Sequence, residues 1–80
     1  MQKNGAYIAD VREWDEFEKS HLDGAVNVPY FDIHGIAKEL LPDKNRKVIV
    51  YCKTGKRSEQ SHNSLHYLGY DVYYLGGIEI

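Results

Sequence analysis

The run Val48–Tyr51 constrains the fold more than any other part of the sequence. It is continuously apolar and mostly β-branched, which is typical of a central parallel strand covered on both faces. Three further short apolar runs predict strands, and amphipathic segments between the four runs predict helices. The strands are expected at 6–11, 25–28, 48–51 and 71–75, and the helices at 13–19, 32–41 and 58–68.

This alternation of strands and helices predicts an α/β fold with a small, open, mostly parallel sheet and helices on both faces. With 80 residues, the chain is expected to form one domain over residues 1–80. Asp32 is expected to cap the second helix and Ser58 the third, and Gly69 is expected to end the third helix.

The composition predicts a protein of the cytoplasm that binds neither nucleic acid nor a membrane. The formal net charge of -2 does not favour nucleic acid or an anionic membrane surface. No apolar stretch reaches the length of a membrane span. The polar start, Met1–Gly5, does not resemble a secretory signal, although a removed signal would place the protein in the periplasm.

Cys52 is the only cysteine, so no intramolecular disulfide is possible. A lone cysteine allows three interpretations: a small buried apolar residue, an incidental thiol or a reactive nucleophile. Cys52 directly follows the central strand, and ligands of open α/β sheets bind at the carboxyl ends of the strands. Its position therefore favours a reactive thiol.

The loop after Cys52 joins a strand to the start of a helix, where backbone N–H groups form an anion-binding nest. Gly55 allows the positive φ that such a turn requires. Three cations, Lys53, Lys56 and Arg57, follow the cysteine within five residues. Helix N-termini and cations lower the pKa of a thiol, so we expect a thiolate-rich Cys52 and attraction of an anionic substrate.

Several ordered motifs resemble the rhodanese homology domain over nearly the whole chain, in a minimal version. The resemblance covers the acidic–basic pair of Asp10-Val11-Arg12, the turn and strand of His21–Pro29 and the cysteine loop of Val48–Ser58. Leu68-Gly69-Tyr70 and Leu75-Gly76-Gly77 resemble the closing helix and strand of that family.

The resemblance implies a sulfurtransferase that uses no metal and no organic cofactor. Cys52 would take sulfane sulfur from a small anionic donor such as thiosulfate, and pass it to cyanide, a thiol or a carrier protein through a persulfide. Arg57 is the expected contact of the donor's anionic group, while His21 and Asn27 are expected to hold the turn before the second strand. The loop that binds the substrate and the transferred sulfur would comprise Lys53, Thr54, Gly55, Lys56 and Arg57. Asp10, Arg12 and Ser58 would support this loop.

Two alternatives remain open. A cysteine phosphatase or arsenate reductase would use Cys52 and Arg57, but the related phosphatase loops are one residue longer, and the shorter loop suits a single sulfur atom. A non-catalytic rhodanese-like binding or regulatory module is the other alternative, and the presence of Cys52 argues against it. His62 and His66 have the spacing of a metal pair, but no third ligand is evident. Tyr51, Tyr73 and Tyr74 are expected only to pack on their strands.

Overall fold

The computed structural model describes residues 5–53 and 55–77. Its four strands are β1 (Tyr7–Asp10), β2 (Val26–Asn27), β3 (Lys47–Cys52) and β4 (Asp71–Gly77). The helices are α1 (Trp14–Lys19), α2 (Ile33–Leu40) and α3 (Lys56–Tyr67), with a short 3₁₀ helix, η2 (Tyr30–Asp32), before α2. Strands and helices alternate along the chain as the sequence predicts.

The strands form one parallel sheet in the order β2-β1-β3-β4. In its register Tyr7 pairs with Val48, and Val48 pairs with Val72. The apolar run of Val48–Tyr51 thus lies in an inner strand, as expected for a segment buried on both faces. The predicted α/β class and parallel sheet are confirmed.

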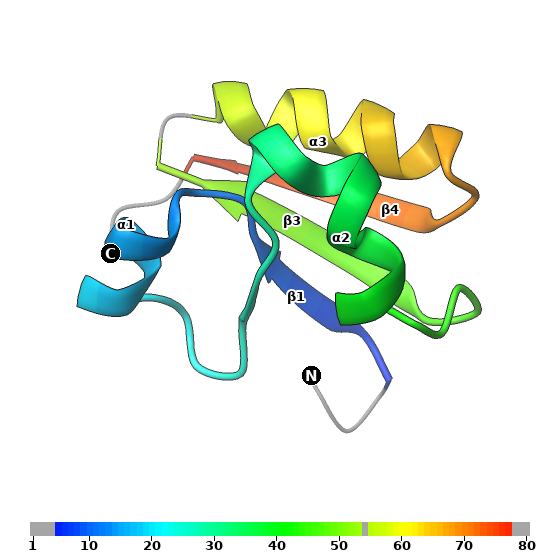
Figure 1. Cartoon of the computed structure of the whole chain (residues 1–80), viewed down its shortest axis with the longest axis horizontal. Helices are drawn as coiled ribbons and strands as arrows, with labels where there is room; N and C mark the ends of the chain where they lie inside the picture. The colour runs from blue at the N-terminus through cyan, green and yellow to red at the C-terminus, as the bar shows by residue number, and fades with distance from the viewer. Residues whose placement is uncertain (1–4, 54, 78–80) are drawn as a thin grey trace.

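The core lies between one face of the sheet and the two longer helices (Figure 1). Side chains of alternate strand residues point to this face, because successive residues of a strand face opposite sides. They pack against Ile33, Ala37 and Leu41 of the α2 segment and against Leu65 of α3. The strand residues of this core are Tyr7, Ala9, Val48, Val50 and Val72.

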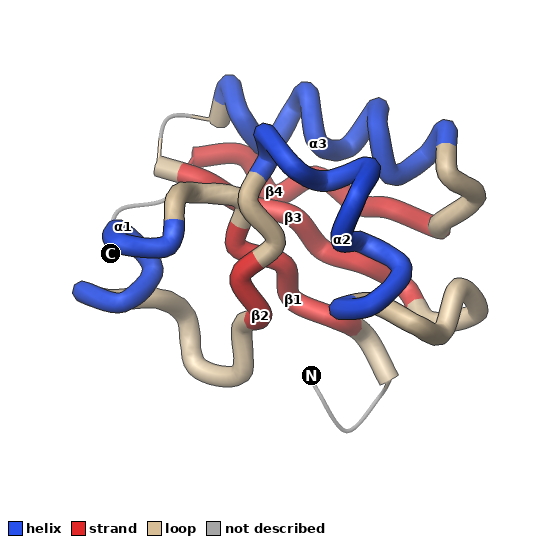
Figure 2. The backbone as a smooth tube through the Cα atoms, in the orientation of Figure 1, coloured by secondary structure: helices blue, strands red, loops and turns tan. Residues whose placement is uncertain are grey.

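The second face of the sheet has less cover among the described residues. Ile8 and Ile49 are half-buried there, and Tyr73 is 48% exposed. Figure 2 shows α2 and α3 together on the first face, while α1 lies apart from them, beside the carboxyl ends of the strands. The second face is therefore covered at that end, where the chain after α1 reaches Tyr51.

The helix ends differ in part from the expected ones. Gly69 has φ +99° and ends α3 in the left-handed conformation that favours glycine, as predicted. Asp32 lies at the N-cap of α2, but its side chain makes no capping hydrogen bond. Ser58 does not cap α3, because the helix begins two residues earlier with Gly55 at its N-cap. No helix in the described parts of the chain is long and apolar enough to cross a membrane.

We expect Leu65→Ala to lower the free energy of unfolding by about 2–5 kcal/mol, because it leaves a cavity where Leu65 is fully buried. Tyr67→Ala is the matched control, since Tyr67 lies on the same helix and is 83% exposed. Urea unfolding followed by circular dichroism measures both. Equal losses in the two variants would contradict the core described here.

Candidate active site

The junction of β3 and α3 places Cys52 at the start of a tight turn. Cys52 is the last residue of β3, and α3 begins only four residues later at Lys56. The turn is this short because Gly55 adopts φ +91°, a conformation that side chains with a Cβ rarely adopt. The first turn of α3 therefore starts beside the cysteine, with its unpaired backbone N–H groups directed there.

Hydrogen-bonding groups of the turn and of the first turn of α3 surround the sulfur of Cys52. The backbone N–H of Gly55 donates to Sγ at 2.9 Å, and the backbone N–H of Ser58 donates at 3.2 Å. The hydroxyl oxygen of Ser58 lies 3.5 Å from Sγ. Cys52 itself is fully buried, so these groups supply the polar contacts that water would otherwise make.

These contacts decide the ionisation of the thiol. Burial alone raises the pKa of Cys52, because it disfavours the charged form. Hydrogen bonds from the Ser58 hydroxyl and from the N–H groups of Ser58, Gly55 and Arg57 outweigh burial and lower the pKa of Cys52 below its ordinary value. The site therefore favours a thiolate.

The cations of the loop contribute less directly than the sequence suggests. The side chains of Lys53 and Lys56 are exposed, where water and salt screen their charges. Arg57 donates its backbone N–H to the sulfur, but its guanidinium has another partner. Short-range donors of the backbone and Ser58, rather than side-chain charge, dominate the environment of the sulfur. Thr54 lies outside the described residues.

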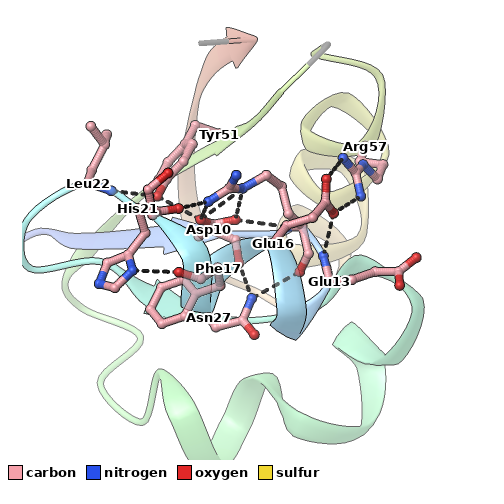
Figure 3. Close-up of polar contacts among 11 residues, drawn as sticks. Asp10, Glu13, Glu16, Phe17, His21, Leu22, Asn27, Tyr51 and Arg57 are labelled. Atoms are coloured by element: carbon pink, nitrogen blue, oxygen red, sulfur yellow. Dashed lines mark hydrogen bonds and ion pairs between the residues drawn. The ribbon is translucent and has the colours of Figure 1, made fainter. Parts of the chain in front are cut away.

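Arg57 joins α3 to α1. Its Nη1 and Nη2 donate to the two carboxylate oxygens of Glu16 at 2.8 and 3.2 Å (Figure 3). The guanidinium also lies 5.7 Å from the ring centroid of Tyr30. The expected contact of Arg57 with the donor's anionic group stays a prediction. The side chain holds α1, a helix that buries none of its own residues.

Asp10 and Arg12 form a buried ion pair at the carboxyl end of β1. The carboxylate of Asp10 accepts hydrogen bonds from the backbone N, Nε and Nη2 of Arg12 at 2.7–3.1 Å. It also accepts one from the hydroxyl of Tyr51 at 2.8 Å (Figure 3). Because no buried side-chain nitrogen or oxygen of the described residues lacks a hydrogen-bond partner, this pair avoids the cost of an unsatisfied buried charge.

The ion pair supports the neighbouring chain rather than the cysteine loop itself. Arg12 Nη2 donates to the carbonyl of Ser20 at 2.5 Å, and the Tyr51 hydroxyl accepts from the N–H of Leu22 at 3.1 Å. Burial raises the pKa of Tyr51 to about 12, so this hydroxyl keeps its proton. Asp10 and Arg12 thus fix Tyr51, which precedes Cys52, and the expectation that they support residues 53–57 stays a prediction.

Asn27 and His21 hold the segment around β2, as the sequence predicts. The side-chain amide of Asn27 donates to the carbonyls of Asp10 and Arg12 at 3.0 and 2.9 Å. Nδ1 of His21 lies 2.7 Å from the carbonyl oxygen of Phe17, and the two rings stack with centroids 3.8 Å apart.

Tyr74 reaches the loop from the neighbouring strand, a contact that sequence reasoning missed. Its hydroxyl donates to the carbonyl of Gly55 at 3.1 Å. Beside this contact, a hollow of about 480 Å³ is lined by Gly55, Lys56, Glu59 and Tyr74. The available signal was the place of Tyr74 near the end of the strand expected at 71–75, because the carboxyl edge of a parallel sheet carries the ligand site.

No group of three metal-ligating side chains occurs in residues 5–53 and 55–77. His62 and His66 lie on α3 with nearly parallel rings whose centroids are 6.4 Å apart; His62 is half-buried and His66 is exposed.

Comparisons with known proteins agree in fold and family. The family model described as "Rhodanese-like domain" matches residues 1–79. Thiosulfate sulfurtransferase PspE from Escherichia coli (strain K12) is 35% identical over 71 residues, which cover 88% of this chain and 68% of PspE. Thiosulfate sulfurtransferase GlpE from Coxiella burnetii (strain RSA 331 / Henzerling II) is 30% identical over 81 residues, which cover 99% of this chain and 74% of GlpE.

A solved structure of a rhodanese with anions from E. coli superposes with a TM-score of 0.83. It is 34% identical, and the match covers 90% of this chain and 86% of that one. Several other curated relatives are longer proteins, and the chain spans 33% or less of their length.

The pair of Glu16 and Arg57 gives a test in acid. The hydrogen bonds from Arg57 lower the pKa of Glu16 to about 2 from its ordinary 4.5. A lowered carboxyl pKa stabilises the fold above pH 4.5, and that stabilisation disappears as the pH falls from 4.5 towards 2. Because the Glu16 side chain is 33% exposed, the contribution is expected to be below about 1 kcal/mol.

We therefore expect Glu16→Gln to lose less stability than the wild type between neutral pH and the acid range, measured by thermal unfolding at a series of pH values. Glu18→Gln is the control, since Glu18 is exposed on the same helix and makes no ion pair among the described residues. An unchanged acid profile in Glu16→Gln would count against the ion pair.

Proposed function

The chain belongs to the rhodanese-like domain family, and from that premise we propose that it is a sulfurtransferase that carries sulfur as a persulfide on Cys52. The observation that carries the proposal is the convergence of the Gly55 N–H, the Ser58 N–H and the Ser58 hydroxyl on a single buried sulfur. Such donors stabilise negative charge on sulfur, which the reaction requires at each step. The family match over residues 1–79 supports one catalytic domain.

In the first step, the thiolate of Cys52 attacks the outer sulfur of a donor such as thiosulfate. A bond forms between Sγ and that sulfur, while the bond between the outer sulfur and the sulfite sulfur breaks. Sulfite leaves with the bonding electron pair, and Cys52 is left as a persulfide. Two relatives named thiosulfate sulfurtransferases, 30–35% identical to this chain, support thiosulfate as the donor class.

In the second step, an acceptor thiolate or cyanide attacks the outer sulfur of the persulfide. The bond to Sγ breaks and Cys52 leaves as a thiolate. The same hydrogen bonds serve both steps, because they lower the pKa of Cys52 and so make it a better leaving group as well as a more ionised nucleophile.

The surroundings of the loop suit an anionic donor and a thiol acceptor. Lys53 and Lys56 are exposed beside the cysteine and attract an anion at long range. The hollow lined by Lys56, Glu59 and Tyr74 gives an acceptor a place next to Gly55. Because Cys52 is fully buried, the atoms that cover the sulfur have to move before a donor reaches it.

The geometry disfavours a phosphatase or an arsenate reductase. Such an enzyme needs a guanidinium above the nucleophile to bind a tetrahedral oxyanion. Here Glu16 holds the Arg57 guanidinium towards α1, through one N–H of each terminal nitrogen. A purely binding module is disfavoured too, because donors that lower the pKa of a thiol serve no purpose in docking.

We expect the wild type to gain the mass of one sulfur atom after incubation with thiosulfate, and to release sulfite in equal amount. Intact-mass spectrometry under non-reducing conditions measures the gain, and a thiol or cyanide added afterwards should remove it. Cys52→Ser is the control and should gain nothing. The proposal fails if the wild type gains no sulfur or if both proteins gain it equally; turnover of an aryl phosphate or arsenate would instead support the alternative.

A further inference from the structure

The carbonyl oxygen of Gly55 has more donors than lone pairs. The N–H of Glu59, the hydroxyl of Ser58 and the hydroxyl of Tyr74 lie 3.0, 3.0 and 3.1 Å from it. A carbonyl oxygen has two lone pairs and so accepts two good hydrogen bonds. One of the three donors is therefore available for another acceptor. The Ser58 hydroxyl lies beside one, the sulfur of Cys52.

Two of the groups within reach of the Ser58 hydroxyl are the Gly55 carbonyl and the sulfur of Cys52, and its single proton can point to either. Its oxygen lies 3.0 Å from the Gly55 carbonyl and 3.5 Å from Sγ. When Cys52 is a thiol, the S–H donates to the Ser58 oxygen, and the Ser58 proton points to Gly55. When Cys52 is a thiolate, the sulfur only accepts, so the Ser58 proton stabilises it by turning to the sulfur. That turn removes a donor from Gly55.

We propose that Tyr74 is a positioning residue for the reacting cysteine: with the Glu59 N–H, its hydroxyl keeps the Gly55 carbonyl satisfied while the Ser58 hydroxyl turns to the sulfur. Leaving a buried carbonyl with one donor fewer is costly, and Tyr74 removes this cost from the thiolate state. The inference rests on the proposed function, since it concerns the same cysteine. Within the described part of the chain the Tyr74 hydroxyl donates to Gly55 and not to the sulfur, so it acts through Gly55 and Ser58.

The place of Tyr74 in the fold supports this role. Glycine restricts φ and ψ weakly, so Gly55 depends on its hydrogen bonds to keep its N–H directed at the sulfur, 2.9 Å away. Ser58 and Glu59 bind the carbonyl from within α3, whereas Tyr74 binds it from β4. Tyr74 thus ties the loop to the sheet while remaining 49% exposed, which makes it a tolerant site for substitution.

Other charged groups near the loop are left intact by a change at Tyr74. Lys53 and Lys56 are exposed, Arg57 is paired with Glu16, and Glu59 lines the hollow beside the loop. His62 lies with its ring centroid 6.3 Å from that of Tyr74. Removing only the hydroxyl oxygen keeps the ring, and with it the contact to His62.

We expect Tyr74→Phe to raise the pKa of Cys52 by about 0.5 to 1 unit, the size of one neutral hydrogen bond. Titration of the Cys52 Cβ chemical shift by NMR measures it without requiring a reagent to reach the buried sulfur. Tyr73→Phe is the matched control: Tyr73 is the adjacent strand residue, is 48% exposed and lies near Lys47 on the other face of the sheet. It should leave the Cys52 titration unchanged.

A double-mutant cycle with Ser58→Ala separates this role from general support of the loop. If Tyr74 acts by freeing the Ser58 hydroxyl, Tyr74→Phe should shift the pKa of Cys52 less than half as far in the Ser58→Ala protein. A wild-type titration in Tyr74→Phe, or an equal shift with and without Ser58, would overturn the proposal. Sulfur uptake from thiosulfate by the wild type is measured alongside, so failure of the proposed function is seen independently of the Tyr74 result.

Discussion

The hydrogen bonds from the Gly55 and Ser58 N–H groups to the Cys52 sulfur are the constraint on which the site depends. They exist because a buried strand ends directly before a left-handed glycine, and the glycine starts a helix whose first N–H groups have no carbonyl partners. A thiol buried to this degree without donors would resist ionisation. With these donors, the Cys52 site both excludes water and stabilises negative charge on the sulfur, which suits sulfur chemistry.

The rest of the carboxyl edge keeps this junction in place through two polar connections between distant parts of the chain. Asp10, Arg12 and Tyr51 form a buried network that joins β1 to β3 and holds the segment after α1. Glu16 and Arg57 join α1 to α3 at the surface. The buried network has all its side-chain atoms satisfied, so it fixes Tyr51 firmly, while the surface pair contributes little stability and mainly sets the position of α1.

Features that depend on local sequence were predictable, and features that depend on side-chain direction were not. The apolar run of Val48–Tyr51 fixed an inner strand, and the position of Cys52 after it with Gly55 nearby indicated the nest. The contact between Arg57 and Glu16 was not predictable, because spacing gives nearness to the sulfur but not the direction of a long side chain, and Glu16 lies 41 residues away. Tyr74 was missed for the same reason, since strand pairing alone brings it to Gly55.

The ionisation midpoint of Cys52 tests the central claim most directly, and it follows from the NMR chemical shift of its Cβ across the pH range. If the converging donors outweigh burial, the midpoint in the wild type lies clearly below the ordinary thiol value of about 8.5. A midpoint at or above that value would contradict the claim, because Cys52 would then be an inert buried thiol, although the fold would be unaffected.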